Sequence, residues 1–160
     1  YLPVHVIRPL VVILLAVMLV YTWFKPQFGQ VDAGRPLTRK DLWAGLAIGA
    51  SIGFYDGFFG PGTGSFLIFL FVRFFHFDFL RASACAKVVN LATNLAALAF
   101  FLPAGLVLYG IAIPMGLANI AGAQVGTRLA LKGGNLWVRR LFLLLALILL
   151  SKLVWDLLRG

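Results

Sequence analysis

The chain is short of charged residues, of acidic residues and of cysteine, and each shortage excludes a class of protein. Only 12% of its 160 residues are charged and 62% are apolar, whereas a soluble domain contains about a quarter charged residues. One small core cannot bury so much apolar side chain, so most of it must face lipid. This excludes a water-soluble enzyme and a disordered tail. The single cysteine, Cys85, excludes an internal disulfide and therefore a disulfide scaffold.

Cations, in contrast, are present in excess. The 14 Lys and Arg against 5 Asp and Glu give a net charge of +9. Most of these cations fall between apolar runs, which is typical of loops beside anionic lipid headgroups rather than of a nucleic-acid-binding surface. We therefore expect the lipid bilayer as a partner, and no nucleic acid.

The apolar runs predict an all-α, polytopic membrane protein of about six helical segments, judged against the roughly 20 residues that span a bilayer. These segments are Val6–Phe24, Leu42–Phe59, Ser65–Leu80, Ala82–Leu102, Leu106–Leu131 and Leu136–Leu158. The connections 25–41 and 128–140 and the turn at Arg81 carry Lys and Arg, whereas residues 60–64 and 103–105 carry no charge. Counting cations over short loops places the first set in the cytoplasm and both chain ends outside.

A faint internal repeat relates the first and last segments. The run from Arg8 to Trp23 resembles the run from Arg140 to Trp155 with the same spacing, although chance agreement between Leu-rich runs is the alternative. The two copies are five segments apart, so a real match implies inverted topology. We therefore expect a piece of a longer chain: 1–24 is the last span of a preceding repeat, 25–41 a cytoplasmic linker and 42–160 a C-terminal transmembrane repeat.

A glycine-rich break separates the second and third segments. Three glycines and a proline in residues 60–64 cannot sustain a helix. The helix that resumes offers free N–H groups and a positive dipole end, and two hydroxyls add donors. The candidate anion-binding residues are therefore Gly60, Gly62, Thr63, Gly64 and Ser65. A surface turn is the alternative, but the third segment is too short for a 30 Å core, so we expect a re-entrant pair with its turn inside the bilayer.

Asp56 lies one turn before the break, in an otherwise uncharged segment. A carboxylate inside a membrane costs about 2.5–3.5 kcal/mol, so it is a functional candidate by default. It is either a proton-coupling residue or a structural partner for Lys87 or a backbone N–H.

A polar stripe follows one face of the fourth segment. Ser83, Lys87, Asn90 and Asn94 fall within about 60° of one another at helical spacing. Asparagine supplies donors and lysine supplies charge, so Lys87, Asn90 and Asn94 are candidate substrate-binding residues. Hydrogen bonds between helices are the alternative, and Lys87 can also extend to the interface.

Two rows of small residues at fourfold spacing predict faces for close helix packing. They are Gly45, Gly49, Gly53 and Gly57, and Ala118, Gly122, Gly126 and Ala130. In contrast, no His, Cys or carboxylate pair has metal spacing, and neither a nucleophile–base pair nor a phosphate-binding loop is evident. We therefore expect no enzyme, no metal and no cofactor.

Two stretches resemble the C-terminal half of the sulfite exporter TauE/SafE family. They are Gly53-Phe54-Tyr55-Asp56-Gly57-Phe58-Phe59-Gly60-Pro61-Gly62-Thr63-Gly64-Ser65-Phe66 and Ala86-Lys87-Val88-Val89-Asn90-Leu91-Ala92-Thr93-Asn94. Gly122-Ala123-Gln124-Val125-Gly126 and Arg139-Arg140-Leu141-Phe142 also fit, and the resemblance covers roughly residues 5–158. It implies a multi-pass permease of the bacterial-type inner (plasma) membrane, built from two related halves, that moves small sulfur-containing or organic anions. It also implies that a missing N-terminal half, or a second copy, is needed as a partner.

Two hypotheses follow. The first is a secondary transporter or exporter of small anions, in which the anion sits between the break and the stripe. The second is a membrane-embedded structural or assembly subunit without a pathway, whose stripe would pack dry against apolar side chains.

Overall fold

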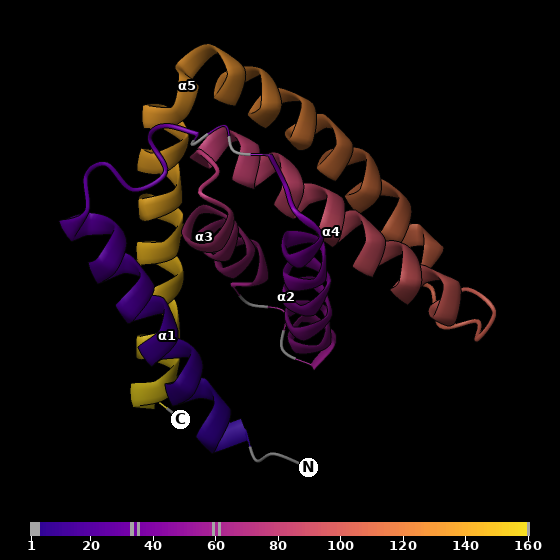
Figure 1. Ribbon diagram of the computed structural model, residues 1–160. Coiled ribbons are helices and arrows are strands. Elements are labelled where there is room, and N and C mark those ends of the chain that lie inside the picture. The colour runs from indigo at the N-terminus through magenta and orange to yellow at the C-terminus, as the bar shows by residue number, and fades with distance from the viewer. Residues whose placement is uncertain (1–3, 33, 35, 59, 61, 160) are drawn as a thin grey trace.

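The computed structural model describes residues 4–32, 34, 36–58, 60 and 62–159, and within them the regular elements are all helices, without strands. The helices are α1 (Val4–Phe24), α2 (Arg39–Phe58), α3 (Thr63–Phe75), α4 (Phe79–Phe101) and α5 (Tyr109–Arg159) (Figure 1). This confirms the predicted all-α class. The described part of the chain has five labelled helices where the apolar runs predicted about six, and the last two predicted segments correspond to the two arms of α5, which meet at a non-helical residue.

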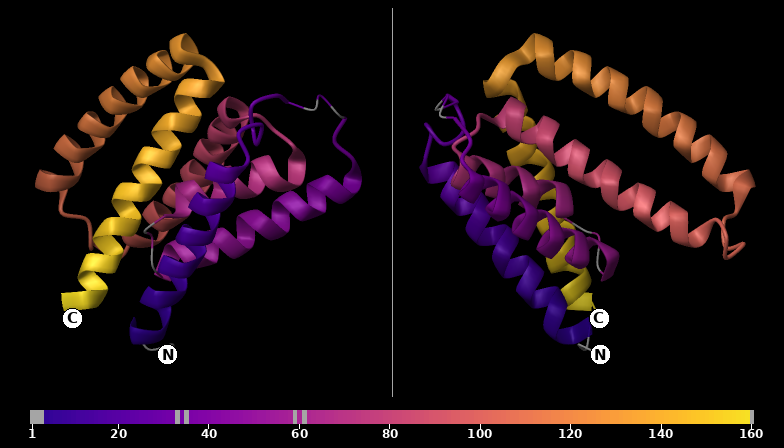
Figure 2. Two further views of the ribbon diagram at one scale, coloured as in Figure 1. Left: turned by 90° about the vertical axis from the view of Figure 1, so that its left-hand side faces the viewer. Right: turned by 45° about the vertical axis from the view of Figure 1, so that its right-hand side comes forward.

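The bend in α5 lies at Gly134. Its backbone has φ 65° and ψ −167°, a conformation essentially restricted to glycine. The first arm of α5, residues 109–133, runs beside α4, and the second arm, residues 135–159, runs beside α1 (Figures 1 and 2). One non-helical glycine thus sends the chain from the first helical arm back along the opposite side of the bundle as the second.

Short polar residues set two of the helix starts. Asp78 caps α4 by accepting a hydrogen bond from the Arg81 N–H at 2.7 Å, so α4 begins at Phe79 rather than at the predicted Ala82. Thr38 and Asp41 bond reciprocally at the start of α2, since the Thr38 N–H donates to the Asp41 carboxylate at 2.8 Å. These caps place both starts earlier than the apolar pattern alone predicted.

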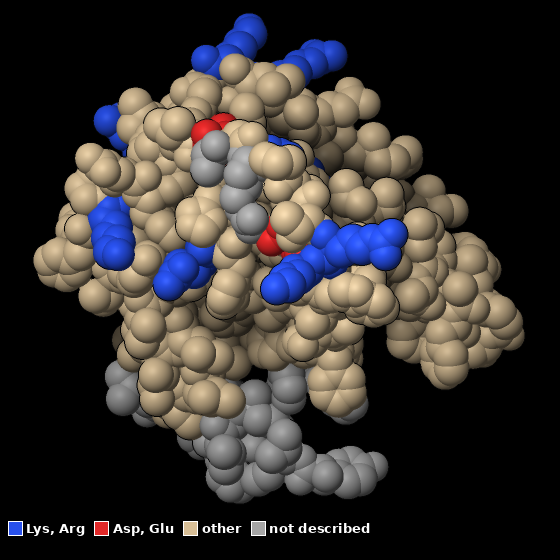
Figure 3. All heavy atoms as spheres, viewed as in Figure 1, with Lys and Arg blue, Asp and Glu red and all other residues tan. Residues whose placement is uncertain are grey.

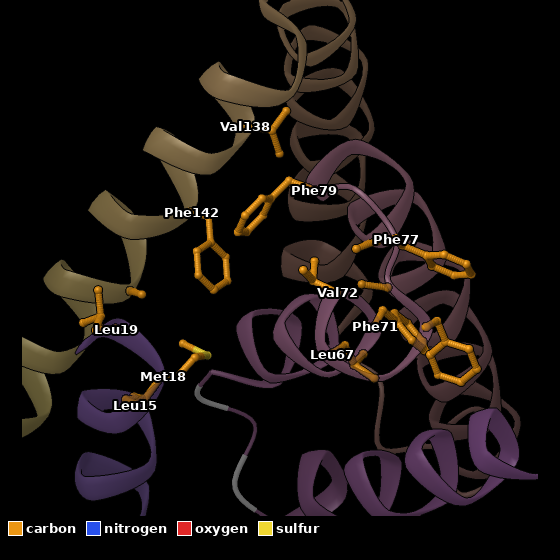
Figure 4. Packing of buried hydrophobic residues seen from close by; sticks show 14 of the residues in the cluster. Leu15, Met18, Leu19, Leu67, Phe71, Val72, Phe77, Phe79, Val138 and Phe142 are labelled. Atoms are coloured by element: carbon orange, nitrogen blue, oxygen red, sulfur yellow. The ribbon is translucent and has the colours of Figure 1, made fainter. Parts of the chain in front are cut away.

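The core lies between α1, α3, the start of α4 and the second arm of α5 (Figure 4). Leu15, Leu67 and Phe79 are fully buried within it. Phe79 packs against Phe142 and Phe28 with ring centroids 5.2 and 6.1 Å apart. Phe69 of α3, which is only 13 residues long, joins this packing through Phe28 and Tyr21, with ring centroids 5.4 and 5.6 Å apart.

Outside this core, large apolar side chains face outward. No described side chain of α2, or of residues 109–131 in the first arm of α5, is buried. Trp43, Phe54 and Phe100 are each about 70% exposed. By length and composition, one helix among the described residues is suited to cross a membrane, namely α4, while Pro9–Phe24 and Thr63–Phe75 are shorter apolar helices. These outer faces require lipid or another apolar surface.

The rows of small residues pack closely at two glycines. A Cβ on Gly45 would lie 3.6 Å from the Phe75 ring, and one on Gly53 would lie 3.2 Å from the Thr93 methyl group. The prediction of close packing is wrong within the described chain at four other glycines, where a Cβ added to the glycine would have nothing within 4 Å. These are Gly49, Gly57, Gly122 and Gly126. Each fourfold step rotates by about 40° around a helix, so a neighbouring helix meets only part of the row.

Three cation-rich segments meet at one end of the bundle. Asn135 accepts from the Leu80 N–H at 3.0 Å and donates to the Gln30 carbonyl, which joins the bend of α5, the start of α4 and the linker after α1. Arg139 Nη2 donates to the Thr22 carbonyl at 2.7 Å near the end of α1. In Figure 3 the Lys and Arg side chains lie over this upper part of the visible face. The predicted cytoplasmic segments are therefore neighbours in space.

The linker is tied to α4 by an exposed ion pair. Arg81 Nη1 donates to Asp32 Oδ2 at 2.7 Å. This hydrogen bond, together with one from the Gly34 N–H, holds the pKa of the Asp32 carboxyl below its ordinary value. Exposed pairs of this kind contribute little to stability, so the linker position depends mainly on the Asn135 contacts and the aromatic core.

Replacing Phe79 by alanine should test the packing at the centre of the core. Phe79→Ala is expected to lower the free energy of unfolding by about 3–5 kcal/mol, because it removes a fully buried ring and leaves a cavity. Phe100→Ala, in the same helix but 70% exposed, is the matched control and should change it little. Thermal unfolding of the purified protein in detergent measures both; equal losses would contradict the assignment of the core.

Candidate functional site

The break between α2 and α3 is built by glycines in left-handed conformations. Gly60 has φ 71°, and Gly62, the cap of α3, has φ 90° and ψ −8°. No side chain bonds to the first turn at this cap, and the first N–H of α3, that of Thr63, donates to the Gly60 carbonyl oxygen at 3.3 Å. Pro61, which the sequence places in the break, lies outside the described residues.

A cavity of about 360 Å³ opens at this break. It is lined by Asp56, Gly60, Gly62, Thr63, Gly64, Ser65, Asn90, Asn94, Leu145 and Leu149. The structure thus brings together the glycine-rich break, Asp56 and the two stripe asparagines, as predicted from the sequence. Polar atoms of α2, α3 and α4 form most of its wall, and the second arm of α5 adds an apolar side.

Gly64 allows α3 to approach the asparagine stripe. A Cβ added at this position would lie 3.7 Å from Asn90 Nδ2, so the backbone of α3 and the Asn90 amide face each other at short range. The Asn90 side-chain oxygen is buried and has no hydrogen-bond partner among the described residues. An unpaired buried acceptor costs about 1–3 kcal/mol, so this oxygen is suited to a donor such as a water molecule, whereas an anion could bond only to the Nδ2 group of the amide.

Asp56 is bonded to hydroxyl groups rather than to a cation. Thr63 Oγ1 lies 2.7 Å from Asp56 Oδ1 and 2.8 Å from the Gly60 carbonyl oxygen. Thr93 Oγ1 lies 3.4 Å from Asp56 Oδ2 and 3.0 Å from the Asn90 carbonyl oxygen. The expected alternative partner, Lys87, makes no contact with Asp56 in the structure.

Lys87 is the one candidate site residue that does not line this cavity. Its Nζ donates to Thr127 Oγ1 in the first arm of α5, at 2.9 Å. With Gln124 and Arg128 it borders a separate hollow of about 480 Å³. Lys87 and Asn90 lie at opposite edges of the stripe, so the long side chain extends toward α5 while the amide faces α3. Among the described residues, no cation lines the cavity at the break.

Three lining or supporting residues were missed in the sequence analysis. Thr93 immediately precedes Asn94 and lies three residues after Asn90, so its position beside the stripe could have identified it. Leu145 and Leu149 share one face of α5 at a spacing of four, but a Leu-rich run gives no signal that separates cavity-lining leucines from lipid-facing ones. No group of three or more His, Cys, Asp or Glu that could hold a metal occurs among the described residues.

Comparison with known proteins gives a consistent result. The model of the family "Sulfite exporter TauE/SafE" matches residues 1–153. A "Probable membrane transporter protein" of Haemophilus influenzae is 35% identical over 136 residues, which is 85% of this chain and 52% of that protein. No solved structure matches.

Two further relatives carry similar names. "Probable membrane transporter protein ORF9" of Sinorhizobium sp is 36% identical over 96% of this chain and 58% of that protein. "Probable membrane transporter protein YfcA" of Escherichia coli K12 is 32% identical over 98% of this chain and 57% of that protein. The chain therefore spans little more than half the length of the curated relatives it matches.

Alanine substitutions at the two glycines that flank Thr63 should distinguish the cost of a left-handed backbone from the cost of adding a Cβ to a helical glycine. Gly62→Ala is expected to cost about 1–2 kcal/mol, because its left-handed φ is unfavourable for other residues and its Cβ would lie 3.2 Å from the Phe66 ring. Gly64→Ala should cost less, since Gly64 is helical and a Cβ there meets only ordinary contacts. Thermal unfolding in detergent compares them; a larger loss for Gly64→Ala would show that the described break is wrong.

Proposed function

We propose that this chain, which belongs to the sulfite exporter TauE/SafE family, forms half of a secondary transporter or exporter of small anions. The substrate class is sulfite, organosulfonates or related sulfur-containing anions, and the location is the inner (plasma) membrane, which the chain crosses several times. Membership of this family makes it a membrane protein.

The observation that carries this proposal is the cavity at the helix break. Asn90, Asn94, Ser65 and the start of α3 all line one space, while the Thr63 hydroxyl is engaged with Asp56 and the Gly60 carbonyl. Amide and hydroxyl donors, together with the positive end of a helix dipole, suit an anion. A volume of about 360 Å³ holds a small anion with a few water molecules.

The exposed apolar faces of the chain support the proposal that it forms half of a transporter. The chain spans about half the length of its relatives, and α2 and the first arm of α5 expose large apolar side chains. A second half, or a second copy, would cover part of these faces. We interpret α1 and the second arm of α5 as related spans of inverted repeats, and α2 with α3 as the re-entrant pair. Rocking of one repeat against the other would alternate access to the cavity.

The structural-subunit hypothesis requires a stripe that packs dry against apolar side chains. Asn90 and Asn94 instead border the cavity, and the buried Asn90 oxygen is unpaired. These observations favour a binding site over a purely structural interface. No second function is therefore proposed.

Asn90→Ala is expected to lower anion flux about tenfold, the effect of losing one hydrogen bond to a charged group worth about 1.5 kcal/mol. Lys87→Ala should lower flux as well if its hollow borders the substrate route. Flux is measured as uptake and efflux of radiolabelled sulfite and sulfoacetate in membrane vesicles, with the protein produced at its natural length. Asn119→Ala, an exposed asparagine of α5 away from the cavity, is the matched control and should keep wild-type flux.

Membrane insertion of each variant is verified by quantifying the protein in washed membranes. Unchanged flux in both Asn90→Ala and Lys87→Ala would overturn the site assignment. Absence of flux in the wild type, for every anion tested, would overturn the transporter itself.

A further inference from the structure

We propose that a second anion site lies between α4 and the first arm of α5, in the hollow bordered by Lys87 and Arg128. Its ligand is an oxyanion, the chemistry that a small sulfonate and the phosphate of a lipid headgroup share. The hollow and the cavity at the break have no lining residue in common. The site is therefore separate from the one on which the proposed function rests.

Two helices supply the walls of this hollow, which has a volume of about 480 Å³. Lys87 of α4 forms one wall, and side chains of α5 form the other, namely Ile120, Ala123, Gln124, Thr127 and Arg128. Steps of three and four residues place these α5 side chains on one stripe of the helix. Two cationic side chains from different helices thus border one space.

The Lys87 side chain is held toward α5. Its Nζ donates to Thr127 Oγ1 at 2.9 Å, and Thr127 directly precedes Arg128 in the chain. A lysine that served only to place its charge in water would extend to the membrane surface instead of bonding to the neighbouring helix. The bond to Thr127 uses one of the three ammonium N–H groups and leaves the others for a ligand.

No carboxylate of the described chain borders this hollow. The sequence has five acidic residues, all of them aspartates. They occupy other parts of the fold: Asp32 in the ion pair with Arg81, Asp41 and Asp78 at helix starts, Asp56 at the break and Asp156 near the end of α5. Two cations that share a hollow without a counter-ion repel each other, and a negative group between them removes that repulsion.

The donors around the hollow suit an oxyanion. The Arg128 guanidinium is a planar fork that matches two oxygens of a sulfonate, a sulfite or a phosphate. Lys87 adds a second positive charge and Gln124 adds an amide donor. Among the described residues, the Arg128 guanidinium takes part in no ion pair or side-chain hydrogen bond, so its fork is free for a ligand.

The hollow lies toward the cation-rich end of the bundle. Lys87 is little more than two turns after the start of α4 at Phe79, and Arg128 is less than two turns before the bend at Gly134. This is the end predicted to be cytoplasmic. A soluble anion and the headgroups of the inner leaflet can both reach it.

Thiol labelling inside the hollow tests the site. Ala123→Cys adds a thiol to the lining without removing a donor, and Ala112→Cys, on the same face of α5 about three turns earlier, is the matched control. The protein, produced at its natural length and purified in a sugar detergent, is labelled with N-ethylmaleimide, and mass spectrometry of the peptide gives the rate at that cysteine. Sulfoacetate should slow labelling of Ala123→Cys and leave Ala112→Cys unchanged. Dimethyl sulfone, a neutral molecule of similar size, should slow neither.

Removing the cations should weaken this protection. In the Ala123→Cys background, Arg128→Gln should raise the sulfoacetate concentration that gives half-protection about tenfold, the effect of losing a hydrogen bond between charged groups, and Lys87→Gln should act in the same direction. Arg128→Lys should recover part of the affinity, because it keeps the charge but loses the fork. Lys152→Gln, which removes an exposed cation from the second arm of α5, is the control and should have no effect. Each variant is compared with itself, with and without the anion, because a nearby cation also changes the reactivity of a thiol.

A parallel measurement distinguishes the two sources of the oxyanion. The sugar detergent contains no phosphate, so phosphatidylglycerol added to it supplies the headgroup separately. Slowing by sulfoacetate identifies a soluble anion as a ligand, and slowing by phosphatidylglycerol alone identifies a headgroup; both results support the site.

Slowing by neither would overturn the proposal, and an acidic side chain of the second half seated in the hollow would give that result. Equal protection in Arg128→Gln, Lys87→Gln and the parent would overturn it too. Labelling reports binding without flux. A chain that carries no anion would therefore contradict the proposed function and leave this result readable.

Discussion

The structure depends on how the backbone N–H and C=O groups between the end of α2 and the start of α3 are hydrogen-bonded. In apolar surroundings each unpaired backbone group costs several kcal/mol, so a helix can break there only if nearby groups replace the lost bonds. The Gly60 carbonyl accepts from both the N–H and the hydroxyl of Thr63, and Thr63 is joined in turn to Asp56. Gly60, Gly62 and Gly64 line the cavity, so the interruption of the helix and the candidate site occur together.

The wall of this site is rigid because of the short helix α3. Its side chains Leu67, Phe71 and Phe75 are buried in the same core as Phe79 and Phe142, so α3 is held against α4 and the second arm of α5. This packing keeps Gly64 beside the Asn90 amide. In contrast, no described side chain of α2 is buried, so Asp56 reaches the site from a helix held mainly through its contacts with α3 and α4.

Much of the site could be predicted because its residues are chemically conspicuous in an apolar chain. Three features of the chain are costly in a membrane, so each indicates a candidate functional role: a Gly-Pro-Gly break, a lone carboxylate, and two asparagines on one helix face. Lys87 shows the limit of that reasoning. Helical periodicity placed it on the same face as Asn90, but its long side chain extends to Thr127 on the other side of α4. Leu145 and Leu149 were missed because nothing in their local pattern separates them from lipid-facing leucines, whereas the position of Thr93 beside the stripe could have identified it.

By itself the sequence determined the helical class, the approximate extents of the helices and the location of the break, because hydrophobic runs, caps and glycines act over a few neighbouring residues. It did not determine that the two arms of α5 meet at the single non-helical residue Gly134, since the same glycine equally permits a longer loop. Nor did it determine which side of the stripe faces α3, or that the second arm of α5 closes the cavity. These depend on contacts between residues far apart in the chain, such as Asn135 with Gln30 and Phe79 with Phe142, which only the packed tertiary structure establishes.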